Sequence, residues 1–153
     1  MTSEIEVTRE QLKYLADRIE IVSIKPLECH AVRHSGEKPS QAIVTLETAR
    51  ASEPERLNYK FDLTCKLSDG AESVVAEVRV VIIAQYKFIA EGDASEETFD
   101  AFGASIALRN AFPYLRQNVQ DLGTRIGLYG LTLGLMRPEA PTTIPVSLEA
   151  SSF

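Results

Sequence analysis

The stretch "LNYKFDLTCKLSDGAESVVAEVRVVIIAQYKF", residues 57–88, decides the fold class of this 153-residue chain. From Leu57 to Leu67 every second residue is apolar, and polar residues stand between them. After a Ser-Asp-Gly turn signal, the same alternation resumes at Val74. Successive side chains of a strand point to opposite faces of a sheet, so this period of two predicts antiparallel strands with one buried face.

The sequence before this stretch predicts two more strands and a short helix. The strands cover roughly 19–33 and 42–49, and Pro26 predicts a bulge or an edge position in the first of them. The short helix begins after Thr8, where Thr-Arg-Glu-Gln has the form of a capping box. Since helices follow the strands, we expect an α+β fold: a four-stranded antiparallel sheet with C-terminal helices packed on one face and an extra short N-terminal helix.

Helical periodicity follows the last predicted strand. Asp93 or Ser95 is expected to open the first helix after the sheet. An apolar seam spaced alternately four and three residues apart then predicts a helix packed along a flat surface. Its members are Leu108, Phe112, Leu115, Val119, Leu122 and Ile126. Because Pro113 is tolerated only in a first turn, we predict that Asn110 caps a new helix and that two helices meet at 109–112.

Composition and charge limit the classes of function. The net charge is −6, and no basic stripe is present, which argues against nucleic acid as a partner. No secretory signal and no run approaching ~18 apolar residues is present, so we expect no membrane insertion. Cys29 and Cys65 have no close spacing, and they are expected to be free thiols of a cytoplasmic protein.

No set of residues in the sequence forms a catalytic site. His30 and His34 are four residues apart but fall in a strand and a loop, where this spacing does not create a metal site. We therefore expect no enzyme activity, no metal and no cofactor. The alternative is a small-molecule-binding or enzymatic α+β domain, with a pocket between sheet and helices lined by Tyr59, Tyr86 and Phe102.

The sequence carries more apolar surface than one four-stranded sheet can cover. The outer face of the last long strand becomes apolar at Val81 and Ile83, and residues 127–136, "GLYGLTLGLM", are apolar but rich in glycine. Two compatible interpretations stay open: core packing together with a homo-oligomer interface, or a groove that binds apolar segments of a partner.

Residues 112–133 resemble the SecB export chaperones. That family carries Phe-Pro-Tyr-x-Arg at a helix start, Arg-x-Gly near the end of that helix and Leu-x-Leu shortly after; here these are residues 112–116, 125–127 and 131–133. The resemblance implies a homotetramer, built as a dimer of dimers, that holds unfolded polypeptides along apolar grooves without ATP. It also implies a role in protein export with SecA as partner, or service to an antitoxin client in the divergent branch of the family.

The resemblance directs attention to two groups of residues. Candidates for the apolar peptide-binding groove are Tyr86, Phe88, Phe112, Tyr114, Leu115, Val119, Leu128, Tyr129, Leu131 and Leu133. Candidates for the subunit interface are Val81, Ile83, Phe99, Phe102 and Ile106. We expect a single SecB-like domain over residues 1–136, followed by an extended or disordered tail over 137–153.

Overall fold

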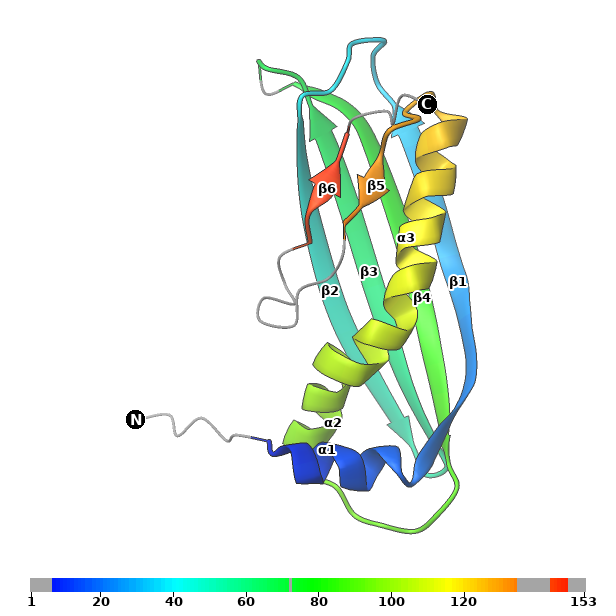
Figure 1. Ribbon diagram of the computed structural model, residues 1–153. Helices are drawn as coiled ribbons and strands as arrows, with labels where there is room; N and C mark the ends of the chain where they lie inside the picture. Colours follow the sequence, from blue (N-terminus) through cyan, green and yellow to red (C-terminus); the bar gives the residue numbers. More distant parts are fainter. Residues whose placement is uncertain (1–6, 72, 135–143, 149–153) are drawn as a thin grey trace.

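A computed structural model describes residues 7–71, 73–134 and 144–148 and shows a long sheet crossed by helices on one face (Figure 1). In chain order the elements are α1 (Arg9–Ala16), β1 (Ile19–Arg33), β2 (Gln41–Glu53), β3 (Arg56–Ser68), β4 (Val74–Phe88), α2 (Glu96–Phe102), the π-helix η1 (Gly103–Ala107), α3 (Leu108–Arg125), β5 (Thr132–Leu133) and β6 (Val146–Ser147). The long strands are antiparallel neighbours in the order β1-β4-β3-β2. The predicted fold class is confirmed.

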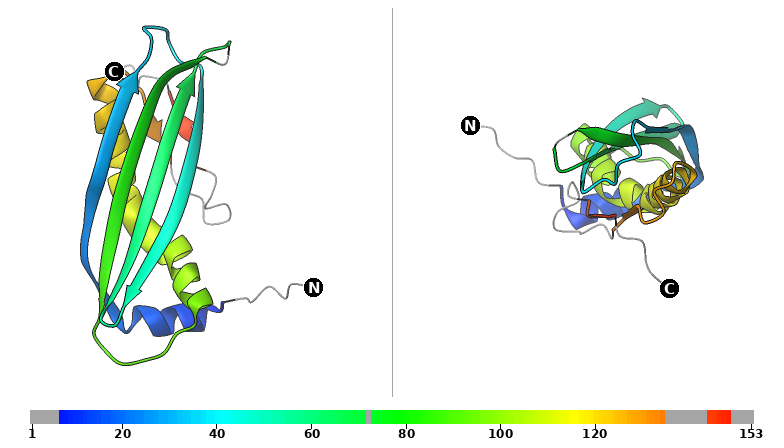
Figure 2. Two further views of the ribbon diagram at one scale, coloured as in Figure 1. Left: turned by 180° about the vertical axis from the view of Figure 1, so that it is seen from behind. Right: turned by 90° about the horizontal axis from the view of Figure 1, so that it is seen from above.

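The register of the two central strands explains the period of two in the sequence. Leu57 pairs with Tyr86 and Phe61 with Ile82, and all four side chains are buried. These rows face the helical layer, in which α3 packs on β4 and β1. The opposite face of the sheet carries none of the described helices (Figure 2). We call this opposite side the open face.

β1 is an edge strand with two irregularities. Its pairing with β4 shifts register between Ile21 and Ser23, and again between Pro26 and Glu28. Proline has no amide hydrogen to donate to a ladder, so an edge strand beside a bulge tolerates it. The sequence predicted one or the other at Pro26, and the structure has both.

The predicted capping box opens α1. Thr8 Oγ1 accepts a hydrogen bond from the Gln11 amide at 3.2 Å, and Gln11 Oε1 accepts one from the Thr8 amide at 2.8 Å. Leu15 of α1 is buried in the core, which places this short helix against one end of the sheet (Figure 1). Within the ranges that the structure describes, no helix is long and apolar enough to cross a membrane.

The predicted helix junction at 109–112 is wrong. The helical chain continues from α2 through η1 into α3, and Pro113 lies inside α3 (Figure 1). Asn110 does not act as a cap, because its side-chain amide donates a hydrogen bond to the Tyr86 hydroxyl at 2.9 Å. Asn110 therefore ties the helix to the sheet.

The helical irregularity lies earlier, where Gly103 begins the π segment against the ring of Tyr59. A Cβ atom on Gly103 would lie 2.5 Å from Tyr59 Cε1. Two hydroxyls bind backbone carbonyls beside this segment: Tyr59 donates to Phe99 at 2.6 Å, and Ser105 donates to Ala101 at 2.5 Å. Side chains that enter the backbone ladder are a known cause of helix bending. The contact with the sheet, and not the proline, therefore sets the position of the irregularity.

Replacing Pro113 by alanine is expected to raise the free energy of unfolding by roughly 1–3 kcal/mol. Alanine supplies the amide that the Arg109 carbonyl lacks inside α3, and it removes the contact between the proline ring and that carbonyl. Urea unfolding followed by circular dichroism measures the change. Equal or lower stability of the variant would show that the helix is built around the proline ring.

The C-terminal segment returns to the body of the protein. β6 pairs antiparallel with β5, and Leu133 lies opposite Val146. Of the tail predicted over 137–153, residues 137–143 and 149–153 lie outside the described part of the chain.

Candidate binding surface

Most of the predicted groove residues lie in the core. The buried ones are Tyr86, Phe112, Leu115, Val119, Leu128, Leu131 and Leu133. They come together because the seam of α3 faces β4 and β1, while β5 packs back on α3. A bound polypeptide could contact those of β4 and α3 only if the interior between helix and sheet opened; these are Tyr86, Phe112, Leu115 and Val119.

Three predicted groove residues are accessible. Tyr114 on α3 is 46% exposed, and Tyr129, shortly after α3, is 73% exposed. Phe88 at the end of β4 is half-buried, and its ring meets that of Phe99 edge-on at 6.4 Å. An exposed tyrosine offers apolar ring area while its hydroxyl stays hydrated, which suits reversible contact with apolar segments.

The predicted interface residues are divided between the two layers. Val81 and Ile83 lie on the open face, whereas Phe99, Phe102 and Ile106 belong to the helical layer. Phe102 is part of the core, and Phe99 and Ile106 are half-buried against it. Val81 is buried as well, so Ile83 is the more accessible of the two apolar residues on the open face.

Arg79 organises the charges of the open face. Its guanidinium donates hydrogen bonds of 3.0 and 2.7 Å to the Asp62 carboxylate and one of 3.2 Å to Glu28. Asp62 and Glu28 are the cross-strand partners of Val81, so these ion-paired side chains flank it on both sides. The hydrogen bonds from Arg79 hold the pKa of Asp62 below its ordinary value.

Replacing Asp62 by asparagine is expected to lower stability at neutral pH, by an amount that shrinks in acid. The pKa of Asp62 is lower in the folded protein than in the unfolded chain, where it is about 4. The carboxylate therefore stabilises the fold fully above about pH 4, and this contribution is lost as the pH falls through the folded-state pKa. Thermal unfolding of both proteins between pH 7 and about pH 3 measures the difference. A gap that stays constant over this range would contradict the role given to the Arg79 pair.

Some exposed apolar residues were missed by the sequence interpretation. Val22 and Leu27 are the residues of β1 left without a partner at its two register shifts, and both are exposed. Ile43 of β2 pairs with Lys66 on the open face and is 64% exposed. Pro26 predicted a bulge or an edge position, but the sequence did not show which neighbouring side chain a bulge would turn outward.

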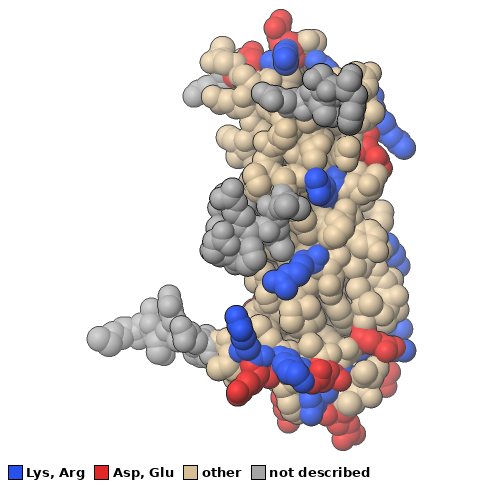
Figure 3. Space-filling model, viewed as in Figure 1, with Lys and Arg blue, Asp and Glu red and all other residues tan. Residues whose placement is uncertain are grey.

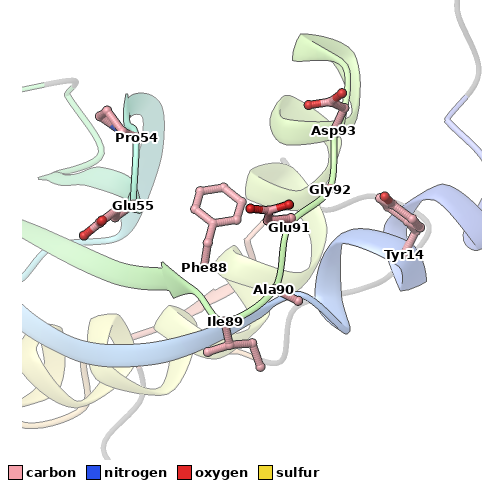
Figure 4. Close-up of a pocket in the computed structure, with 9 residues that line it drawn as sticks. All are labelled: Tyr14, Pro54, Glu55, Phe88, Ile89, Ala90, Glu91, Gly92 and Asp93. Carbon is pink, nitrogen blue, oxygen red and sulfur yellow. The ribbon is translucent and has the colours of Figure 1, made fainter.

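Two of the hollows on the described surface lie at opposite ends of the sheet. The larger one, about 940 Å³, is lined by Tyr14 of α1, by the β2–β3 turn and by the segment from Phe88 to Asp93 (Figure 4). Its carboxylates, including Glu55, are exposed, and among its lining residues no buried polar group could fix a ligand. The smaller hollow, about 280 Å³, lies beside the end of α3 and is described below.

The aromatic pocket of the alternative hypothesis is filled. The rings of Tyr59, Tyr86 and Phe102 pack on one another with centroids 5.3 to 6.1 Å apart. Both hydroxyls are engaged, Tyr59 with the Phe99 carbonyl and Tyr86 with Asn110. Burial raises the pKa of both tyrosines. These groups stabilise the helix–sheet contact and leave no ligand cavity between them.

The described residues do not bring three metal-ligating side chains together. His34 Nε2 lies 3.8 Å from the Glu77 carboxylate on the surface. Cys29 is exposed, while Cys65 is buried in the core, and burial raises the pKa of the Cys65 thiol to about 11. A buried thiol with a raised pKa is a poor nucleophile at neutral pH.

The end of α3 is fixed by a glycine and by an arginine from β1. Gly127 has φ of 82°, a conformation that favours glycine, and the Leu128 amide reaches back to the Gly123 carbonyl at 2.7 Å. This is the hydrogen bond of a Schellman motif. Arg33 donates to the Ile126 carbonyl at 3.0 Å. The chain therefore turns sharply after α3 and returns toward the sheet.

No family model matches the chain. Two relatives from strains of Mycobacterium tuberculosis, the SecB-like chaperones MT2006 (CDC 1551 / Oshkosh) and Rv1957 (ATCC 25618 / H37Rv), are each 27% identical over 151 residues, covering 84% of this chain and 83% of the relative. The solved Mycobacterium tuberculosis Rv1957 SecB-like chaperone, in complex with a ChAD peptide from the Rv1956 HigA1 antitoxin, matches with a TM-score of 0.76 and 26% identity, covering 85% of this chain and 99% of that chain. The chain therefore resembles SecB-like chaperones in sequence and in fold.

The SecB-like motifs now have structural roles. Residues 112–116 lie inside α3, with Phe112 buried in the core and Tyr114 exposed. Residues 125–127 end the helix in the Schellman motif, and residues 131–133 lead into β5 with both leucines buried. The motifs therefore mark the long helix, its C-terminal turn and the segment that returns to the core.

Proposed function

We propose that this SecB-like chain is an ATP-independent chaperone that holds unfolded or non-native polypeptides. The observation that carries the proposal is its match in sequence and fold to a SecB-like chaperone solved with an antitoxin peptide. Non-native chains expose apolar segments, and burying them on an apolar surface is favourable whatever their sequence. Such a holding function needs accessible apolar area and no catalytic group.

Accessible apolar area is present on the helical side. Charged side chains gather toward the two ends of this face, and the surface between them is mostly uncharged apart from a few basic side chains (Figure 3). Tyr114 and Tyr129 contribute to the accessible apolar area of the helical layer. An extended segment of a client could therefore lie along this side without burying many charges, which would be costly.

We propose an antitoxin as the client in preference to delivery to the SecA motor. The resemblance to the SecB chaperones implies that contact with SecA would use acidic residues on the open face. In this chain Arg79 pairs with Asp62 and Glu28 on that face, and Lys60 and Lys66 lie among the acids. These cations reduce the negative charge that a SecA-type contact requires. The antitoxin peptide bound by the solved relative supports an antitoxin as the client.

We propose that the chain works as a cytoplasmic homotetramer, a dimer of dimers. β1 and β2 each have a strand neighbour on one side only, so the four-stranded sheet has two free edges. Proteins usually cover or interrupt such edges, because unpaired strand edges promote association. Ile43 of the edge strand β2 and Ile83 of the inner strand β4 add apolar surface on the open face.

Two measurements test the proposed function. Size-exclusion chromatography with light scattering is expected to give the mass of a tetramer. Chemically denatured citrate synthase, diluted into buffer without ATP, is expected to aggregate less as more of the chaperone is added. A monomer that leaves the aggregation unchanged would overturn the proposal, and serum albumin at equal mass serves as the control for non-specific protection.

A further inference from the structure

The segment Ile144–Leu148 is bound to the protein in the way an extended peptide would be. Its sequence, Ile-Pro-Val-Ser-Leu, alternates apolar residues with Pro145 and Ser147. Ile144 is 8% exposed and belongs to the core, and Val146 and Leu148 are half-buried against it, whereas the two residues between them are exposed. One face of the segment thus points inward, as in a strand added to a sheet edge.

Backbone contacts hold the segment in a single register. Val146 pairs with Leu133, and the Gly134 amide donates to the Pro145 carbonyl at 2.6 Å. The approach at Gly134 is close, because a Cβ atom there would lie 2.6 Å from Pro145 Cγ. A ladder of only two residues on each strand is marginally stable in isolation, so this pairing belongs to the least stable part of the sheet structure.

The surface under the segment continues into the smaller hollow. Leu148 lines this 280 Å³ hollow together with Leu131, Tyr129 and Arg33. The hollow combines buried leucine side chains with an exposed aromatic ring, and it opens beside the end of the paired segment. A peptide longer than the five described residues could therefore continue from the strand pairing into the hollow.

We infer that residues 144–148 occupy a peptide-binding site that serves the client, and that an extended client segment binds to β5 in place of β6. The site would accept a segment with apolar residues at alternate positions, paired through its backbone with Leu133 and Gly134. The inference rests on the proposed chaperone function and specifies how that function is performed. The segment then acts as an intramolecular competitor, because the site is available only in the fraction of molecules that have released it.

Two substitutions release the segment from opposite ends, and both leave the sequence of β5 unchanged. Ile144→Ser removes the buried apolar anchor. Leu148→Ser removes the half-buried side chain that lines the smaller hollow. Gly70→Ala is the control outside the segment, because a Cβ atom on Gly70 has no heavy atom within 4 Å.

Client affinity is measured by fluorescence anisotropy, with reduced and carboxymethylated α-lactalbumin as the unfolded probe. Both release variants are expected to bind the probe roughly three- to tenfold more tightly than the wild type and the Gly70 control. The reason is that residues 144–148 fill the site in most wild-type molecules and so lower its apparent affinity for the probe. Unchanged or weaker binding by both variants would overturn the inference, because the segment would then be unrelated to the site or a part of its wall.

A second arm uses no client. A labelled peptide with the sequence Ile-Pro-Val-Ser-Leu is expected to bind the Ile144→Ser protein and to slow amide hydrogen exchange at Gly134, with weaker binding to the wild type. If wild type and variants hold the unfolded probe with equal affinity, the chaperone function survives and the inference fails. If the peptide binds but no form holds the probe, the chaperone function fails and the segment is only a structural contact, which overturns the inference too.

Discussion

Leu115→Ala is expected to lower the free energy of unfolding by roughly 2–5 kcal/mol, whereas Tyr114→Ala is expected to change it by less than about 0.5 kcal/mol. Leu115 has no exposed surface and packs in the seam of α3 against the sheet, so truncation leaves a cavity. The neighbouring Tyr114 is 46% exposed, and its truncation leaves the core intact. Urea unfolding of the two variants measures both values.

The same pair of variants separates the core from the client-binding surface. Under the proposed function, Tyr114→Ala is expected to weaken binding of an unfolded client by roughly three- to tenfold. Leu115→Ala, measured at a temperature where it is fully folded, is expected to bind like the wild type. Equal destabilisation by the two variants would contradict the assignment of helix faces, and tighter binding by Leu115→Ala would show that clients enter the interior.

Tyr59→Ala is expected to lower the free energy of unfolding by roughly 3–5 kcal/mol. The Tyr59 ring packs against three other aromatic rings, those of Phe61, Tyr86 and Phe102. Its hydroxyl donates a hydrogen bond to the Phe99 carbonyl. Tyr59→Phe keeps the ring and loses only the hydrogen bond, so it is expected to cost about 1–2 kcal/mol. If the two variants were equally destabilised, the hydrogen bond and not the ring packing would carry the effect.

The Tyr59 variants also have a predicted pH dependence. Burial raises the pKa of Tyr59 in the folded protein, so the neutral hydroxyl stabilises the fold fully below the ordinary tyrosine pKa of about 10. Above that pH the unfolded chain ionises first, and stability falls. Tyr59→Phe removes this term, so its stability is expected to fall less steeply above pH 10 than that of the wild type. Parallel curves would contradict the assignment.

The central strand β3 could be predicted from the sequence because its inward and outward side chains differ in polarity from Leu57 to Leu67. The alternation from Leu57 to Leu67 fixes which side chains face inward, and the structure buries all of these apolar residues. The edge position of Pro26 follows from its missing amide. These features are local, so a single sequence is sufficient to identify them.

The helix interruption and the binding site could not be located in the same way. Pro113 gave a local signal, yet the irregularity lies at Gly103, where a tyrosine from β3 approaches the helix. The apolar seam of α3 was compatible with a groove and with a core. Periodicity shows that one face of a helix is apolar, but it does not show what covers that face. Leu115 and Val119 are covered by the chain's own sheet.

The strand order affects how this chain can fold while the ribosome is synthesising it. β1 is made first, but among the long strands it pairs only with β4, so Ile19 meets Phe88 and has no earlier partner. Until β4 has been synthesised, the β2–β3 hairpin is the only part of the long sheet that can form, and β1 keeps both edges unpaired. Such non-local pairings form slowly and leave the nascent chain prone to aggregation. A protein proposed to hold non-native chains therefore passes through an aggregation-prone state during its own synthesis.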